Sequence, residues 1–184
     1  MFSYRIDENL ELRLLEERHA AELFALIEQN RAYLREWMPW LDNNITIADT
    51  QEFIKARLER FAENNGLQVS IVYRNQLAGQ IGFHSIDWLN KKTEIGYWLG
   101  AAFQGKGLMT KACHALVSYA FDELELNRVE IRCATENKRS RAVPERLRFT
   151  QEGTAREAEW LYDHYVDLIV YAVLARQWRD IIKS

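Results

Sequence analysis

A glycine-containing turn, Gln104-Gly105-Lys106-Gly107-Leu108-Met109-Thr110, separates a segment with a strand pattern from one with a helical pattern. Its two glycines let the chain turn sharply, so that successive backbone N–H groups aim at one point. The unpaired N–H groups of the helix's first turn and the positive end of its dipole favour a phosphate there. Lys106 and Lys111 could add positive charge. The turn therefore predicts an anion site, although two glycines in this setting also suit a plain tight connection.

Two classes of phosphate-binding protein compete for this turn. Residues 100–106 match the start of a Walker A loop, but Gly107 stands where a Ser or Thr must hold magnesium. The turn also lies past the middle of the chain, whereas the phosphate loop of a doubly wound sheet is expected near its start. The nucleoside-triphosphatase interpretation is therefore the weaker one.

The apolar spacing on both sides of the turn predicts alternating strands and helices. We expect an extended stretch at residues 2–15, broken near residue 8, and strands at 67–73, 77–86, 93–100, 128–134, 149–160 and 165–174. We expect helices at 16–30, 33–41, 50–64, 108–124 and 138–148, and a helical or frayed tail at 175–184. Pro39 is expected to end its helix. Pro144 is expected to make its helix start late or kink, since an interior proline costs about 3 kcal/mol.

The alternating strands and helices indicate an α/β class, and length and composition predict a single domain over residues 1–184, because 184 residues that are 48% apolar can bury a substantial core. A net charge of −3 argues against a strongly basic nucleic-acid binder, so we expect no direct DNA binding. Cys113 and Cys133 lie far apart, which suits free thiols in a reducing compartment. The first residues have neither a signal-peptide core nor a membrane span, and a cytoplasmic protein is expected.

The turn resembles the Gln/Arg-x-x-Gly-x-Gly/Ala turn of the GNAT acetyltransferase superfamily at Gln104 and Gly107. Met109 departs from the last motif position and would crowd a pyrophosphate unless its side chain turns into the core. Other stretches look like the RimJ/RimL-like subgroup, which acetylates the N-termini of ribosomal proteins. These are Glu94-Ile95-Gly96-Tyr97-Trp98-Leu99, Asn137-x-x-Ser140, Arg148-Phe149-x-x-Glu152-Gly153, Trp37-Met38-Pro39-Trp40 and Ala158-Glu159-Trp160. The resemblance spans roughly residues 8–174.

This resemblance implies an α+β fold: a mixed, mostly antiparallel sheet that splays in the middle and carries helices on both faces. It implies that acetyl-CoA lies between the strands at 93–100 and 128–134, with its pantetheine arm on the backbone of Tyr97, Trp98 and Leu99. An N–H near Trp98 or Leu99 would hold the oxyanion. The residues expected at the pyrophosphate are those of the turn: Gln104, Gly105, Lys106, Gly107, Leu108, Met109 and Thr110. Asn137 would contact the pantetheine or cap the following helix.

No metal is expected, since the four histidines show no ligand spacing. The amine must be neutral to attack, and an α-amine with a pKa near 8 gives up its proton at pH 7 for about 1 kcal/mol, against roughly 4 to 5 for a lysine. Glu159 is the candidate base, directly or through a water, and Glu157, two residues away on the same strand face, is the alternative. A solvated strand carboxylate is the competing interpretation of either residue.

Many members of the superfamily supply a tyrosine to the departing thiolate, but residues 137–148 contain none. Ser140 takes that place in the resemblance, unless it only caps its helix. Cys133 could approach the CoA sulfur, or be a buried inert thiol. Trp37 and Trp40, one helical turn apart around Pro39, could wall the acceptor site instead of packing in the core.

A cluster of basic residues, Lys138, Arg139, Arg141, Arg146 and Arg148, suits a solvated helix face, the CoA 3′-phosphate or ribosomal RNA. The predicted function is acetyl transfer in a ternary complex to a primary amine, most simply the N-terminal α-amine of a ribosomal or similar protein. The alternatives are a small amine acceptor (a polyamine, amino acid or antibiotic) and a non-catalytic acyl-CoA-binding module. The two long final strands could pair across a homodimer or higher homo-oligomer.

Overall fold

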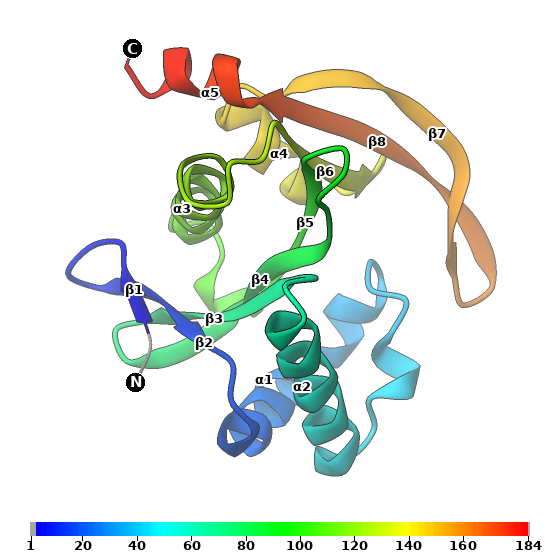
Figure 1. The fold of residues 1–184 in the computed structure, drawn as a ribbon. Coiled ribbons are helices and arrows are strands. Elements are labelled where there is room, and N and C mark those ends of the chain that lie inside the picture. The colour runs from blue at the N-terminus through cyan, green and yellow to red at the C-terminus, as the bar shows by residue number, and fades with distance from the viewer. Residues whose placement is uncertain (1–2, 184) are drawn as a thin grey trace.

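The computed structural model describes residues 3–183, so residues 2 and 184 of the predicted terminal segments lie outside it. Its strands are β1 (Ser3–Arg5), β2 (Leu10–Leu14), β3 (Leu67–Tyr73), β4 (Gln76–Asp87), β5 (Lys92–Leu99), β6 (Arg128–Ala134), β7 (Thr150–Leu161) and β8 (His164–Leu174). Its α-helices are α1 (Ala20–Arg35), α2 (Ile47–Ala62), α3 (Leu108–Asp122), α4 (Lys138–Arg146) and α5 (Ala175–Ile181). The strands form one sheet in the order β1-β2-β3-β4-β5-β6-β8-β7 (Figure 1).

The sheet divides between β5 and β6, its one parallel pair among the described strands. These strands pair only at their first residues, from Lys92 with Arg128 to Glu94 with Glu130. Beyond that point they separate, and the rest of β5 pairs on one side only, with β4. The predicted mixed, mostly antiparallel and splayed sheet is therefore confirmed.

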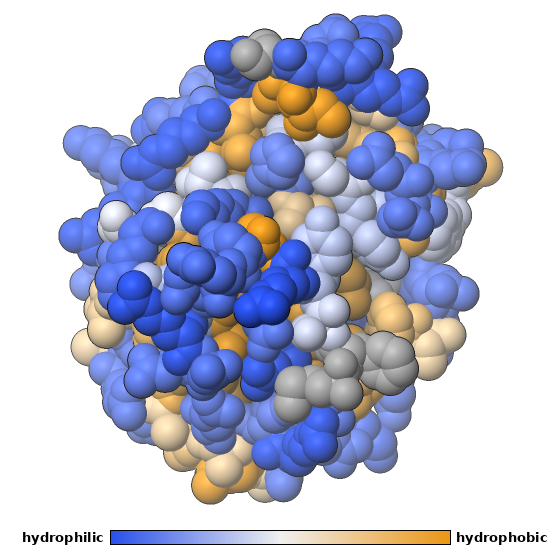
Figure 2. Space-filling view, turned by 90° about the vertical axis from the view of Figure 1, so that its left-hand side faces the viewer, coloured by the Kyte–Doolittle hydropathy of each residue, from blue (hydrophilic) through white to orange (hydrophobic). Residues whose placement is uncertain are grey.

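Helices cover both faces of the sheet, as predicted (Figure 1). The larger apolar core contains the buried side of α3, including Leu116 and Val117, packed against side chains of the central strands. A second core joins α1 and α2 to Trp98 of β5. None of the helices within residues 3–183 is long and apolar enough to cross a membrane. The face that carries α3 and the β1–β2 loop is mostly hydrophilic, with apolar groups gathered near α5 at the top of Figure 2.

Two predicted helix boundaries near the N-terminus are wrong. The expected separate helix at 33–41 does not form, because α1 continues to Arg35 and the chain then turns. The N–H groups of Trp37 and Met38 both bond to the Leu34 carbonyl, which closes the helix, and Pro39 cannot extend it. α2 starts three residues before the predicted residue 50, because Thr46 and Asp49 form a capping box.

The helix that contains Pro144 starts at Lys138, so the predicted late start is also wrong. Pro144 has no N–H to give to the carbonyl of Ser140, four residues earlier. The hydroxyl of Tyr97 on β5 donates to that carbonyl instead, at 2.9 Å. A side chain from the sheet thus satisfies the helix carbonyl that the proline leaves unpaired.

Candidate active site

The glycine turn enters α3 through two residues with left-handed backbone, Gly105 at φ +74° and Gly107 at φ +71°. A Cβ added at either would meet no heavy atom within 4 Å, so the backbone angle and not crowding requires glycine. Gly107 is the N-cap of α3, and the first intrahelical bond from the turn is Lys111 N–H to Gly107 O, at 3.1 Å. The N–H groups of residues 108–110 are therefore free to bind an anion.

The charged and bulky side chains at the turn have other contacts within the protein. Lys106 Nζ bonds to the Ala102 carbonyl at 2.7 Å, and Lys111 Nζ pairs with Asp7 at 2.7 Å. Asp7 offsets the charge of Lys111, whereas the carbonyl bonded to Lys106 leaves the charge of that lysine in place beside the turn. Met109 is 7% exposed and packs in the larger core, so it does not crowd the turn in the way that its place in the motif suggested.

Two cavities meet where β5 and α4 face each other. The turn cavity, about 1000 Å³, lies over the glycine turn and reaches Tyr97 and Ser140. The α2 cavity, about 720 Å³, lies between α2 and the splayed strands and reaches the same two residues. Six residues line both cavities: Trp37, Met38, Tyr97, Trp98, Asn137 and Ser140. The predicted cofactor residues lie in the turn cavity, except Lys106, which is not part of its wall.

The backbone of β5 presents an unpaired edge to the turn cavity. Gly100 N–H bonds to the Ala78 carbonyl of β4, at 2.9 Å. Strand alternation turns the N–H of Trp98 toward β4 as well, and those of Tyr97 and Leu99 toward the splay. Of the two predicted oxyanion donors, Leu99 therefore faces the cavity and Trp98 does not. An extended ligand with a terminal phosphate fits this edge and the turn beyond it.

Three polar side chains gather where the cavities meet. Ser140 Oγ lies 3.2 Å from Cys133 Sγ and 3.4 Å from the Tyr97 hydroxyl. Asn137 caps α4 by accepting the N–H of Ser140 at 3.1 Å, which leaves the serine hydroxyl free of capping. Burial raises the pKa of Tyr97 and that of Cys133, so both remain protonated. The raised pKa of Cys133 is that of an inert thiol.

Sequence reasoning placed Tyr97 by its backbone alone and missed its hydroxyl. A tyrosine is absent from α4, as noted, but the sheet supplies one from the opposite side. The signal that could have revealed it is Pro144, because a proline inside a helix predicts an unpaired carbonyl at Ser140 and hence a donor nearby.

Glu159 is half-buried and lines the α2 cavity. Burial raises its pKa above the usual carboxyl value of 4.5, the Glu94 carboxylate raises it further, and His84 opposes this. Glu94 itself has partners, with Arg132 at 3.3 Å and His84 at 3.5 Å. The imidazole of His84 lies across Gly96, where an added Cβ would come within 2.0 Å of its ring nitrogen. Glycine at this position thus makes room for the charged cluster beside Glu159.

Glu157, the alternative base, is not on the same face of the strand. β7 bulges between Ala155 and Glu159, and Glu157 has a left-handed backbone at φ +47°. Its N–H bonds to the Asp167 carboxylate at 2.8 Å, and the residue lines neither cavity. The two-residue alternation that supported Glu157 fails because the bulge breaks the pleat.

The tryptophans predicted at the acceptor site lie in the loop after α1 and not one helical turn apart. Trp37 lines both cavities, and Trp40 lines the α2 cavity, with its ring 6.3 Å from that of Trp98. Together these rings wall the region where the cavities meet.

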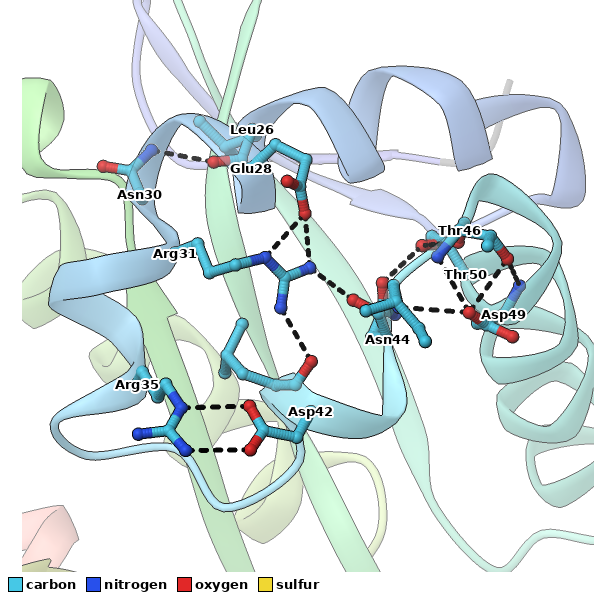
Figure 3. A network of polar contacts seen from close by, with 12 residues as sticks. Leu26, Glu28, Asn30, Arg31, Arg35, Asp42, Asn44, Thr46, Asp49 and Thr50 are labelled. Carbon is cyan, nitrogen blue, oxygen red and sulfur yellow. Dashed lines mark hydrogen bonds and ion pairs between the residues drawn. The ribbon is translucent and has the colours of Figure 1, made fainter. Parts of the chain in front are cut away.

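A polar network holds this loop against α1 (Figure 3). Arg31 donates to the carbonyl of Leu41, at 2.8 Å, and to that of Asn44. Arg35 makes two bonds to the Asp42 carboxylate, at 3.0 and 2.9 Å. Two arginines of α1 therefore hold residues 41–44, the part of the loop that follows the tryptophans.

The turn between β7 and β8 contacts the same loop on either side of Trp40, at Met38 and Leu41. The Tyr162 hydroxyl donates to the Met38 carbonyl and accepts from the N–H of Leu41, at 3.3 Å. Arg35 lies 3.8 Å over the Tyr162 ring. The β7–β8 turn thus holds the loop whose residues Met38 and Trp40 line the α2 cavity.

The residues of the basic cluster do not all face the turn cavity. Lys138, Arg139 and Arg146 line the turn cavity, and Arg139 bonds to Gln104 at 2.9 Å. Arg141 turns away, to the Tyr171 hydroxyl at 3.1 Å and the carbonyl of residue 135. Within residues 3–183 no three His, Cys, Asp or Glu side chains are placed to hold a metal ion.

Comparisons with known proteins agree with this geometry. Residues 9–150 match the acetyltransferase (GNAT) domain family. The chain is 33% identical to a ribosomal-protein-serine acetyltransferase of Escherichia coli, over 91% of this chain and 94% of that protein.

Two solved structures share the fold. One is RimL, an alpha-N-acetyltransferase of a ribosomal protein, with coenzyme A in a disulfide with one of its cysteines (TM-score 0.91, 30% identity, 94% of this chain and 98% of that one). The other is the microcin self-immunity acetyltransferase MccE with acetyl-CoA and AMP (TM-score 0.89, 34% identity, 92% and 94%). The chain therefore belongs to the GNAT family of acetyl-CoA-dependent N-acetyltransferases, in the subgroup of the ribosomal-protein enzymes RimJ and RimL.

Proposed function

We propose that this enzyme acetylates the N-terminal α-amine of a ribosomal or similar protein in the cytoplasm, as one domain that binds both substrates at once. The observation that carries the proposal is the meeting of the two cavities. One has the phosphate-binding turn and the free edge of β5, the other holds the Glu159 carboxylate, and Ser140 lies where they join. The ribosomal-protein acetyltransferases among its relatives support this acceptor and this compartment.

In this proposal the turn holds the pyrophosphate of acetyl-CoA, and the backbone of Tyr97 and the carbonyl of Leu99 hold the pantetheine by hydrogen bonds. Glu159 takes the proton of the amine, directly or through a water. The nitrogen then attacks the thioester carbon, and the Leu99 N–H stabilises the oxyanion. The C–S bond breaks, the nitrogen releases its second proton to solvent as the amide forms, and the thiolate that leaves accepts a hydrogen bond from Ser140.

The Ser140 hydroxyl suits this role because Cys133 stays protonated and can donate to the serine oxygen. The Tyr97 hydroxyl gives its own hydrogen to the Ser140 carbonyl, so it accepts from the serine at 3.4 Å, a long contact that the thiolate can replace. The coenzyme A disulfide in RimL supports placing the CoA sulfur near a cysteine, and Cys133 lies 3.2 Å from Ser140.

The pKa of the acceptor favours a chain terminus over a lysine. At pH 7 an α-amine loses its proton for about 1 kcal/mol, whereas a lysine costs roughly 4 to 5. One half-buried carboxylate, that of Glu159, is enough to deprotonate an α-amine. A small acceptor is the second candidate, because MccE is similar to this chain and was crystallised with acetyl-CoA and AMP.

The test is acetyl-CoA turnover, followed by free-thiol release, with ribosomal N-terminal peptides, spermidine and free lysine as acceptors. We expect turnover of the peptides and its loss in Glu159→Gln, while Glu157→Gln, the matched control, retains activity. Selective turnover of a small amine would transfer the assignment to the second candidate. Tight CoA binding without turnover of any acceptor would leave only a binding module.

A further inference from the structure

The α2 cavity contains an arginine that no carboxylate among the described residues pairs with. Arg57 of α2 is half-buried and lines the cavity, and its guanidinium lies 5.0 Å over the Phe53 ring. Within residues 3–183, no acidic side chain forms a hydrogen bond or ion pair with it. Burial, with Arg60 nearby, lowers the pKa of Arg57, which is the mark of a charge without compensation. A partly buried cation of this kind is complementary to an anion.

A second unpaired donor lies in the wall of the same cavity. Gln80 of β4 is 2% exposed, and its side-chain nitrogen is buried with no hydrogen-bond partner in the described part of the chain. Leaving a buried N–H unpaired costs folding free energy, and an oxygen atom of a ligand in the cavity would remove that cost. Gln80 and Arg57 come from different elements, one from the sheet and one from the helix above it.

The acidic residues of the cavity leave both donors free. Asp49 is occupied by the capping box with Thr46. Glu94 is paired with Arg132 and His84. Glu52 and Glu159 form no hydrogen bond or ion pair with another side chain of residues 3–183, and neither pairs with Arg57 or Gln80. The cavity thus presents Glu159 as a free carboxylate for an amine and, elsewhere on its wall, free donors for an oxyanion.

We propose that Arg57 and Gln80 form a subsite for a carboxylate of the acceptor, borne by an acidic side chain close behind its N-terminal residue. This inference rests on the proposed function and specifies its substrate. Glu159, the base for the amine, lines the α2 cavity from β7, whereas Arg57 and Gln80 line it from α2 and β4, on the other side of the splay. An anion held there lies against a different wall from the amine, as a side chain of the residues that follow the terminus can.

The test compares two acceptor peptides that differ only by Asp or Asn among the residues that follow the first. We expect wild type to prefer the acidic peptide through KM. Arg57→Gln should raise the KM for that peptide about tenfold, as the loss of one charge-assisted hydrogen bond would. Its kcat, and its KM for the Asn peptide, should change little. Lys55→Gln, an exposed position of the same helix outside the cavity, is the control.

Gln80→Leu provides a second test that does not depend on how Arg57→Gln folds, and it should reduce the same preference. Equal KM values for the two peptides in wild type, or an equal effect of Arg57→Gln on both, would overturn the subsite and leave terminal acetylation intact. If no peptide is acetylated, the proposed function fails. A preference for a free amino acid over its amide, lost in Arg57→Gln, would then place the anion on a small acceptor and overturn the peptide assignment.

Discussion

The hydroxyl of Tyr97 ties the sheet to α4 through a carbonyl that Pro144 leaves unpaired. Tyr97→Phe should remove this bond and lower the free energy of unfolding by about 1 kcal/mol. Adding Pro144→Ala gives Ser140 O a helical N–H partner, so the double variant should recover stability. Thermal unfolding of wild type, the two single variants and the double variant measures the coupling free energy between Tyr97 and Pro144. Strictly additive effects would show that the tyrosine and the proline act independently.

Glu159 should determine the acid limb of the pH–rate profile. A base must be deprotonated, and burial raises the pKa of Glu159 above 4.5, so kcat/KM should fall as pH drops through a value above that of an ordinary carboxyl. The raised pKa means that the folded protein holds this proton more tightly than the unfolded chain. Its contribution to stability is therefore present at low pH and lost as pH rises through the folded pKa.

The variant Glu159→Gln should accordingly lose activity without losing stability at pH 7. Chemical denaturation at pH 5 and pH 8 would check this, with Glu157→Gln as the control that keeps the wild-type behaviour. A large loss of stability in Glu159→Gln would show that the carboxylate is structural.

At this scale the sequence could indicate residue types but not their surroundings. The motifs named Ser140 and Glu159, and the structure places both on cavity walls, but the partners that tune them come from distant elements. Arg57 and Gln80 could not be predicted, because an unpaired donor becomes visible only when every neighbour has been located. Glu157 was misplaced because a bulge of β7 leaves no clear mark in local composition.

The N-terminal turn of α3 requires glycine at position 107 for its backbone angle. Gly107→Ala must hold alanine at φ +71°, which costs about 1 kcal/mol in stability. It should also weaken CoA affinity, since the N–H groups of the first helical turn would shift. Isothermal titration with CoA, beside thermal unfolding, would measure both. Gly153→Ala, at a β7 glycine with open space around it, is the control and should leave CoA affinity unchanged.

Elements with strong periodicity were predictable. α3 and β6 form where the apolar spacing placed them, because their buried faces repeat without interruption. The short helix at 33–41 was wrong because its aromatic residues are held by tertiary contacts. Arg31, Arg35 and Tyr162 shape that loop, and none of these contacts can be seen in a window of local sequence.

Across the whole molecule, the hairpin of β7 and β8 reaches the loop that follows α1 (Figure 1). Tyr162→Phe would remove the hydroxyl that bonds to Met38 and Leu41. The loop that carries Trp37 and Trp40 should then be held less firmly against the α2 cavity. We expect the KM for the amine to rise severalfold, within the effect of losing one or two hydrogen bonds, while CoA affinity stays the same. Steady-state kinetics with each substrate varied would separate the two.

Tyr165→Phe offers a matched control for that experiment. Tyr165 is 58% exposed and packs on Trp160 without a bond to the loop, so its loss should leave both constants unchanged. An equal effect of the two variants would mean that the hairpin, and not the bond, shapes the cavity. The fold of the whole chain was predictable, since the family motifs extend over most of its length, but this contact between distant segments was not.

The separation of β5 from β6 gives the sheet an edge strand inside the molecule. The amides of Tyr97 and Leu99 point away from β4 there, beyond the last residues that pair with β6, and no strand within residues 3–183 pairs with them on that side. In the free enzyme they should exchange their hydrogens with solvent faster than the paired amides beside them, and binding of acetyl-CoA should slow them. Two backbone positions would then report occupancy of the cofactor site directly, even in variants that have lost all catalytic activity.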